Sequence, residues 1–174
     1  MDLRALNRQA LDVNLELIAT IRPDQYELRT PCAKWNIGEL LQHLVDSTYG
    51  FAGQPADGSY ADAAEAVTRK FNSDGYLDEV ADFGTFGKLP GSVKVGVHLV
   101  DTVVHAWDLN RALGRPADLD PVLAQAALKL AERLPDTPQV RGPEAAFNHP
   151  VQIADDASLT DRLIAMSGRT PTWA

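Results

Sequence analysis

The chain has 174 residues, of which 45% are apolar, and it carries a net charge of −8 and a single cysteine. This composition is typical of a globular protein, and we expect one domain over residues 1–174. The acidic charge and the lack of a basic stripe argue against a nucleic-acid partner. We expect no membrane span and no signal peptide, and a lone cysteine suits a cytoplasmic location.

Two helices are predicted in the first third of the chain. Apolar residues recur at helical spacing over residues 3–21, and a proline-bounded loop follows. Residues 36–39, Asn-Ile-Gly-Glu, form a capping box, in which Asn and Glu satisfy free backbone N–H groups of the first turn. We expect the helix that begins there to run to about Gly50.

Residues 51–90 form a long connection with one strongly helical piece, about residues 61–71. Residues 83–89 are expected to form a short strand. A connection of this length is too long for a hairpin loop. It therefore suggests a crossover between helices that need not run antiparallel.

The most apolar helix is predicted from about Ser92 to Leu113, where Gly114 and Pro116 end it. The pair Asp120–Pro121 is an N-cap followed by proline in the first turn, and predicts a further helix to about residue 134.

The C-terminal part of the chain is predicted to be less regular. Four prolines interrupt the stretch from residue 135 to residue 150, and residues 151–154 are expected to pair as a short strand. A capping box at residues 158–161 begins a last helix, which Gly168 ends. The whole pattern predicts a mainly α protein with four main helices and a small C-terminal appendage.

A polar stripe runs along the predicted helix of residues 92–113. His98, Asp101, His105 and Asp108 fall within roughly 80° of one another on a helix of about 100° per residue. Apolar residues flank the stripe on both sides, so we expect it to be buried and to need partners. Asp101 and His105, four residues apart, suit chelation of one metal ion. A hydrogen-bonded pair in the core is the alternative.

A catalytic zinc-type site needs a third protein ligand from elsewhere in the chain. His98 could chelate with Asp101, but it lies about 10 Å along the helix from His105. His149 lies in the proline-rich tail and is expected at the surface. His43 lies at the edge of the apolar face of the second helix, and we take it as the third ligand.

Other polar and aromatic residues near this stripe have less specific patterns. Asp108 lies one turn beyond His105, where it would either hold an imidazole N–H or cap a surface turn. Cys32 has no histidine nearby in sequence and is expected to be a small buried residue rather than a nucleophile. Trp35 and Trp107 are expected in the core.

Two segments resemble a known family. Residues 30–36, TPCAKWN, and residues 40–45, LLQHLV, resemble the second-helix signature of the DinB-like metal-binding bundles. They are particularly similar to the N-terminal domain of mycothiol-dependent maleylpyruvate isomerase and its actinobacterial relatives. Residues 101–109, DTVVHAWDL, match that family's carboxylate-x3-His segment. The tail, residues 147–173, resembles the ending of its shorter, uncharacterised members.

This resemblance implies an up-down-down-up four-helix bundle. It also implies a divalent metal, zinc first and nickel as the alternative, held by His43, Asp101 and His105. Asp108 and His98 are expected to lie beside these ligands without binding the ion. Asp101 stands where the isomerase often has Glu, and the chain ends before the second domain of the full isomerase. Fold and metal site are therefore carried over more directly than the isomerase reaction.

Together these observations favour a metal-dependent enzyme that uses a low-molecular-weight thiol such as mycothiol, as a transferase or isomerase. The alternatives are a metal-dependent hydrolase, a non-catalytic bundle that binds a metal or small ligand, and a structural bundle with an empty site. A small molecule is the expected partner. The sequence leaves the oligomeric state open, a homodimer included.

Overall fold

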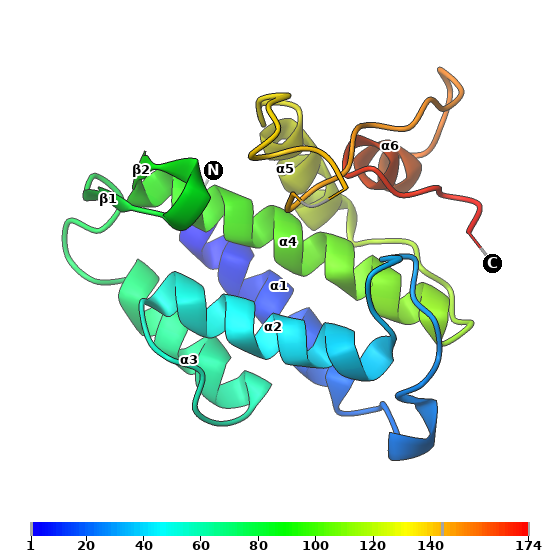
Figure 1. Cartoon of the computed structure of the whole chain (residues 1–174), viewed down its shortest axis with the longest axis horizontal. Coiled ribbons are helices and arrows are strands. Elements are labelled where there is room, and N and C mark those ends of the chain that lie inside the picture. Colours follow the sequence, from blue (N-terminus) through cyan, green and yellow to red (C-terminus); the bar gives the residue numbers. More distant parts are fainter. Residues whose placement is uncertain (1, 144, 174) are drawn as a thin grey trace.

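A computed structural model describes residues 2–143 and 145–173 (Figure 1). Their secondary structure is mainly helical, with one short antiparallel hairpin in which Ala81 pairs with Leu89. The α-helices are α1 (Leu3–Ile18), α2 (Ile37–Ala52), α3 (Tyr60–Phe71), α4 (Gly91–Ala112), α5 (Pro121–Ala131) and α6 (Leu159–Met166), and the strands are β1 (Val80–Asp82) and β2 (Lys88–Pro90).

Helices α1 to α4 form a four-helix bundle, and specific contacts fix their directions (Figure 1). Asn7 of α1 bonds to His98 of α4, and Asn14 donates to the carbonyl of Thr102, so α1 and α4 run parallel. Helices α2 and α3 both run in the opposite direction. The predicted up-down-down-up bundle is therefore confirmed.

One helix of the bundle differs from the sequence-based expectation. Its fourth member is α3, which the sequence pattern assigns to the connection, whereas α5 packs with α6 on the other side of α4. Helix α3 buries a face made largely of alanines, which allows close approach to α2. The 40-residue connection is thus a loop, a bundle helix and a hairpin, and α2 and α4 run antiparallel.

Three local predictions are also corrected. The strand expected at residues 83–89 is mostly the turn of the hairpin, where Gly84 and Gly87 adopt positive φ angles of 54° and 73°. Residues 151–154 form no strand, although Val151 donates to Ala165. Helices α1 and α5 end about three residues earlier than expected, in tight turns.

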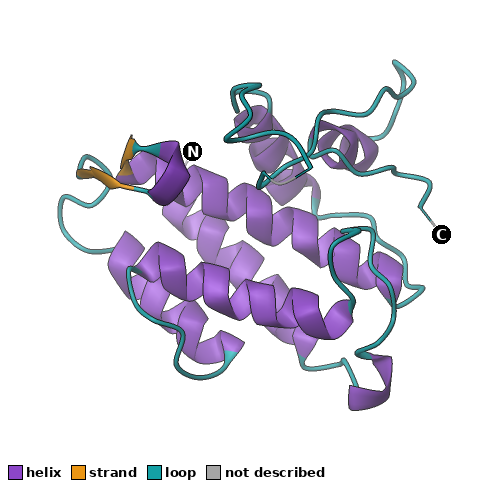
Figure 2. Cartoon of the chain, in the orientation of Figure 1, coloured by secondary structure: helices purple, strands orange, loops and turns teal. Residues whose placement is uncertain are grey.

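Helix α4 lies at the centre of the molecule and is buried on most sides, as expected. One group of buried apolar side chains joins it to α1, α2 and α3, and a second joins it to α5 and α6. Irregular segments gather between α1 and α2 and around α5 and α6 (Figure 2). Among the described residues, no helix combines the length and apolar character required to cross a bilayer.

Candidate metal centre

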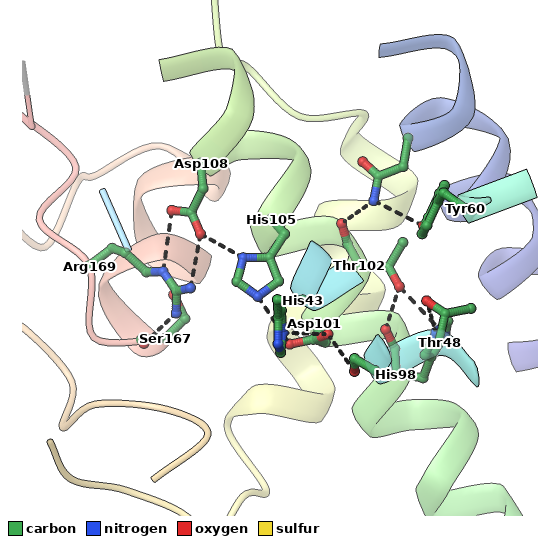
Figure 3. Close-up of polar contacts among 12 residues, drawn as sticks. His43, Thr48, Tyr60, His98, Asp101, Thr102, His105, Asp108, Ser167 and Arg169 are labelled. Carbon is green, nitrogen blue, oxygen red and sulfur yellow. Dashed lines mark hydrogen bonds and ion pairs between the residues drawn. The ribbon is translucent and has the colours of Figure 1, made fainter. Parts of the chain in front are cut away.

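Three potential metal-ligating side chains converge between α2 and α4 (Figure 3). His43 comes from α2, and Asp101 and His105 come from successive turns of α4. One ligand atom from each residue lies within 4.8 Å of the other two. The Nε2 atom of His105 is 3.3 Å from Asp101 Oδ1, and His43 Nε2 is 3.8 Å from Asp101 Oδ2.

The imidazole of His43 is fixed in place but incompletely bonded. Its ring stacks on Trp35, with the ring centroids 4.2 Å apart and the planes inclined by 23°. Its Nε2 atom is buried, and no residue in the described part of the chain forms a hydrogen bond with it. A buried polar atom without a partner is unusual in folded proteins, and this one points towards Asp101 and His105.

His105 is held from behind by Asp108. The Nδ1–H group of His105 donates to Asp108 Oδ2 over 2.8 Å, since an ionised carboxylate can only accept. This bond directs Nε2 towards Asp101. Burial lowers the pKa of His105, but the charges of Asp101 and Asp108 and their hydrogen bonds outweigh it and raise the pKa to about 9.

Both carboxylates are favoured in the charged form. Burial raises the pKa of Asp101, but His105 and His43 outweigh this and hold the pKa well below its usual value. Burial acts in the same direction on the pKa of Asp108, and Arg169 together with His105 lowers it. The arrangement therefore presents one anionic carboxylate between two imidazoles.

Arg169 completes this arrangement from the C-terminal tail, and sequence reasoning missed it. Its Nε and one terminal nitrogen donate to the two oxygens of Asp108 over 3.3 and 2.9 Å, and the other terminal nitrogen donates to the Ser167 carbonyl. Asp108 is fully buried, and Arg169 is 9% exposed. The only available signal was that a buried carboxylate needs a cation, because 61 residues separate the pair.

His98 lies outside the cluster. Its Nδ1 is 2.9 Å from Asn7 Nδ2, and its Nε2 is 3.4 Å from the hydroxyl of Thr48. Its ring packs edge-on against Phe51 and Phe71, and burial lowers its pKa to about 4. None of these contacts reaches the three clustered side chains, so a supporting role for His98 stays a prediction.

A cavity of about 400 Å³ opens beside the cluster. Cys32 and Trp35 line it, which their sequence context did not predict, whereas Trp107 is buried in the core as expected. Burial raises the pKa of the Cys32 thiol, which favours its protonated form. His149 lies at the surface, as expected, and pairs with Asp136.

Comparison with known proteins places the chain among its relatives. Residues 7–85 match the mycothiol maleylpyruvate isomerase N-terminal domain. Two uncharacterised proteins of Mycobacterium tuberculosis, from strains CDC 1551 and H37Rv, are each 34% identical to this chain over an alignment of 182 residues. Each alignment covers 98% of this chain and 99% of the relative. The chain belongs to one family with these two mycobacterial proteins, and its residues 7–85 resemble the mycothiol maleylpyruvate isomerase N-terminal domain.

The region matched to this domain covers most of α1 and all of α2, α3 and β1, and contains His43. Asp101 and His105 lie beyond it, within the nearly full-length alignment to the mycobacterial relatives. No solved structure matches the chain significantly.

Proposed function

We propose that this protein binds one divalent metal ion, zinc in the first place, through His43, Asp101 and His105, and that it is an enzyme acting with a low-molecular-weight thiol. The observation that carries the proposal is the convergence of three ligand atoms at the edge of a cavity large enough for a small molecule. Mycothiol is the thiol that the family suggests.

The residues present fit such an ion. Two imidazole nitrogens and a carboxylate oxygen are donors that zinc prefers. The unpartnered Nε2 atom of His43 would gain a partner, and the ion would take the place of the proton that His105 shares with Asp101. Three protein ligands leave a position for a further ligand, which supports an enzyme over a closed structural site.

The surrounding residues would orient the ligands. Asp108 holds the Nδ1–H group of His105, so that Nε2 faces the site and would bind an ion in place of its proton. Arg169 neutralises Asp108 and holds it in position, and Trp35 fixes the plane of His43. A bound divalent ion would lower the pKa of a coordinated thiol or water and so supply a nucleophile near neutral pH.

Metal content tests the ligand assignment. Protein purified without a histidine tag is expected to hold about one ion per chain, and the His105→Ala variant is expected to lose it. His149→Ala is the matched control, because His149 is exposed and lies outside the cluster. Equal metal content in wild type and His105→Ala would remove His105 from the site.

The thiol is tested separately on cobalt-loaded protein, in which thiolate ligation produces a new near-ultraviolet absorption band. Addition of mycothiol is expected to produce this band. Addition of a disaccharide analogue that lacks the sulfur is expected to leave the spectrum unchanged. Metal binding without any response to the thiol would favour the alternative of a non-catalytic metal-binding bundle.

A further inference from the structure

The cavity beside the cluster has a wall that is strongly aromatic. Phe51 of α2 packs on Phe83, with ring centroids 4.9 Å apart, and Phe83 packs on Phe86 at 5.6 Å. We refer to these three side chains as the aromatic wall. Phe147 and Trp173 of the C-terminal segment also line the cavity. Rings from three distant parts of the chain therefore face one space.

The positively charged side chains that line this cavity are either paired with a carboxylate or exposed to solvent. Among the described lining residues, Arg169 and Lys34 are cations, and His105 joins them only in the metal-free chain, where its pKa is raised to about 9. Arg169 forms a two-oxygen ion pair with Asp108, which neutralises it. The side chain of Lys34 is exposed to solvent, so its charge is screened by water. Once His105 binds an ion as a neutral imidazole, the metal ion is the cationic partner that the cavity offers an anion beside the cluster.

The charges of the cluster set how much negative charge a ligand can bring. A divalent ion with the single anionic ligand Asp101 has a net charge of +1, because His43 and His105 would bind as neutral imidazoles. One monoanionic group balances this charge. A second anionic group would lie against the aromatic wall without a partner, and burial of an unpaired charge is strongly unfavourable.

We propose that the cavity takes a ligand with one monoanionic metal-ligating group and an apolar, ring-containing body packed on the aromatic wall, and that it disfavours dianions. This inference rests on the proposed metal site and concerns a ligand that occupies the open coordination position in place of mycothiol. The volume of about 400 Å³ lies within the range of small-molecule sites, about 300–1,000 Å³.

Three hydroxamic acids that share one metal-ligating group test the proposal on zinc-loaded protein by calorimetry. Acetohydroxamic acid carries a methyl body, benzohydroxamic acid a ring, and para-carboxybenzohydroxamic acid the same ring with a second charge. Each affinity is divided by that compound's affinity for aqueous zinc, which removes differences in the ligating group. The resulting ratio is expected to be at least tenfold higher for benzohydroxamic acid than for either of the other two compounds.

Variants locate the effect in the aromatic wall. Phe83→Ser is expected to weaken benzohydroxamic acid at least fivefold and to leave acetohydroxamic acid unchanged. Tyr26→Ser is the control, because Tyr26 is 40% exposed and does not line the cavity. Equal affinities for the methyl and ring compounds, or tight binding of the carboxylated ring, would overturn the ligand class while leaving the metal site intact. A chain that binds no zinc would overturn the metal site and this inference with it.

Discussion

His98 is a neutral histidine in the core, although its sequence pattern placed it on the same stripe as the candidate ligands. Its ring nitrogens contact Asn7 and Thr48, and Phe51 and Phe71 pack against it. Periodicity alone places His98 on the face of Asp101 and His105, but nearly two turns of helix, about 10 Å, separate it from His105. Which neighbour a polar side chain meets depends on the packing of the other helices.

The pKa of His98 predicts acid sensitivity. Its pKa is about 4 in the folded chain and about 6.5 when unfolded. Below pH 6.5 the unfolded chain gains a proton that the folded chain does not bind, so the free energy of unfolding falls as the pH drops from 6.5 towards 4. The slope approaches about 1.4 kcal/mol per pH unit, with a total loss of roughly 3 kcal/mol.

Urea unfolding at pH 7 and pH 4.5 measures this effect. The stability difference between wild type and His98→Gln is expected to shrink or reverse at pH 4.5, because the variant lacks the titrating group. His149→Gln, which alters an exposed histidine, is expected to follow wild type at both values. If the stabilities of wild type and His98→Gln change in parallel, His98 is not the source of acid sensitivity.

Asp108 acts on the proposed metal site through His105. Asp108→Asn is expected to lower metal affinity about 10- to 100-fold, because His105 loses the anion that holds its Nδ1–H group. Competition with a chelator measures the affinity, and circular dichroism checks that the variant folds. Asp136→Asn removes the carboxylate beside the exposed His149 and is the control. Unchanged affinity in Asp108→Asn would show that the hydrogen bond does not support the ligand.

Among the elements, the C-terminal tail is the part that sequence patterns described least well. The tail brings Arg169 to Asp108 and Trp173 to the cavity, across long sequence distances. Gly168 directly precedes Arg169 and has a φ of 82°. A Cβ atom at this position would lie 2.4 Å from Asn148 Cβ, so the close approach of two tail segments requires glycine.

Gly168→Ala is therefore expected to destabilise the protein more than a change in backbone preference alone would. Gly114→Ala is the matched control, since Gly114 also has a positive φ, 65°, but nothing lies within 4 Å of its added Cβ. Chemical denaturation measures the free energy of unfolding of each variant. We expect Gly114→Ala to lower it by about 1–2 kcal/mol, and Gly168→Ala to lower it by at least about 1 kcal/mol more. Equal losses of stability in the two variants would show that the tail shifts to make room for the added Cβ at residue 168 without a loss of stability.

For the molecule as a whole, the bundle does not depend on the candidate ligands for its core. Buried apolar side chains from all the α-helices fill two groups around α4. His43, Asp101 and His105 come from only two of these helices. Removal of an ion would thus affect one helix pair.

We therefore expect the metal-free protein to remain helical and to unfold cooperatively, unlike a small zinc finger. Added metal is expected to raise the midpoint of thermal unfolding through mass action. Circular dichroism melts before and after chelation measure both effects. Loss of the cooperative transition on chelation would make the metal structural and weaken the proposal of an enzyme.

The sequence by itself determined the features that depend on neighbouring residues. The capping box at residues 36–39 begins α2 as predicted, with Asn36 and Glu39 bonded to each other's backbone N–H groups. Asp101 and His105 share a face because helix geometry alone places residues i and i+4 together. The position of His43 at the edge of the apolar face of its helix indicates it as the third ligand, and the likeness to a known family implies the same residue and adds the bundle topology.

Only the tertiary structure decided which distant segments meet. It placed α3 in the bundle, paired Arg169 with Asp108 across 61 residues, and gathered the aromatic wall from α2 and the hairpin. Apolar periodicity reports that a face is buried but not what covers it, because many partners of similar hydrophobicity satisfy the same pattern. The partner is selected by the shape and charge of the whole packed chain.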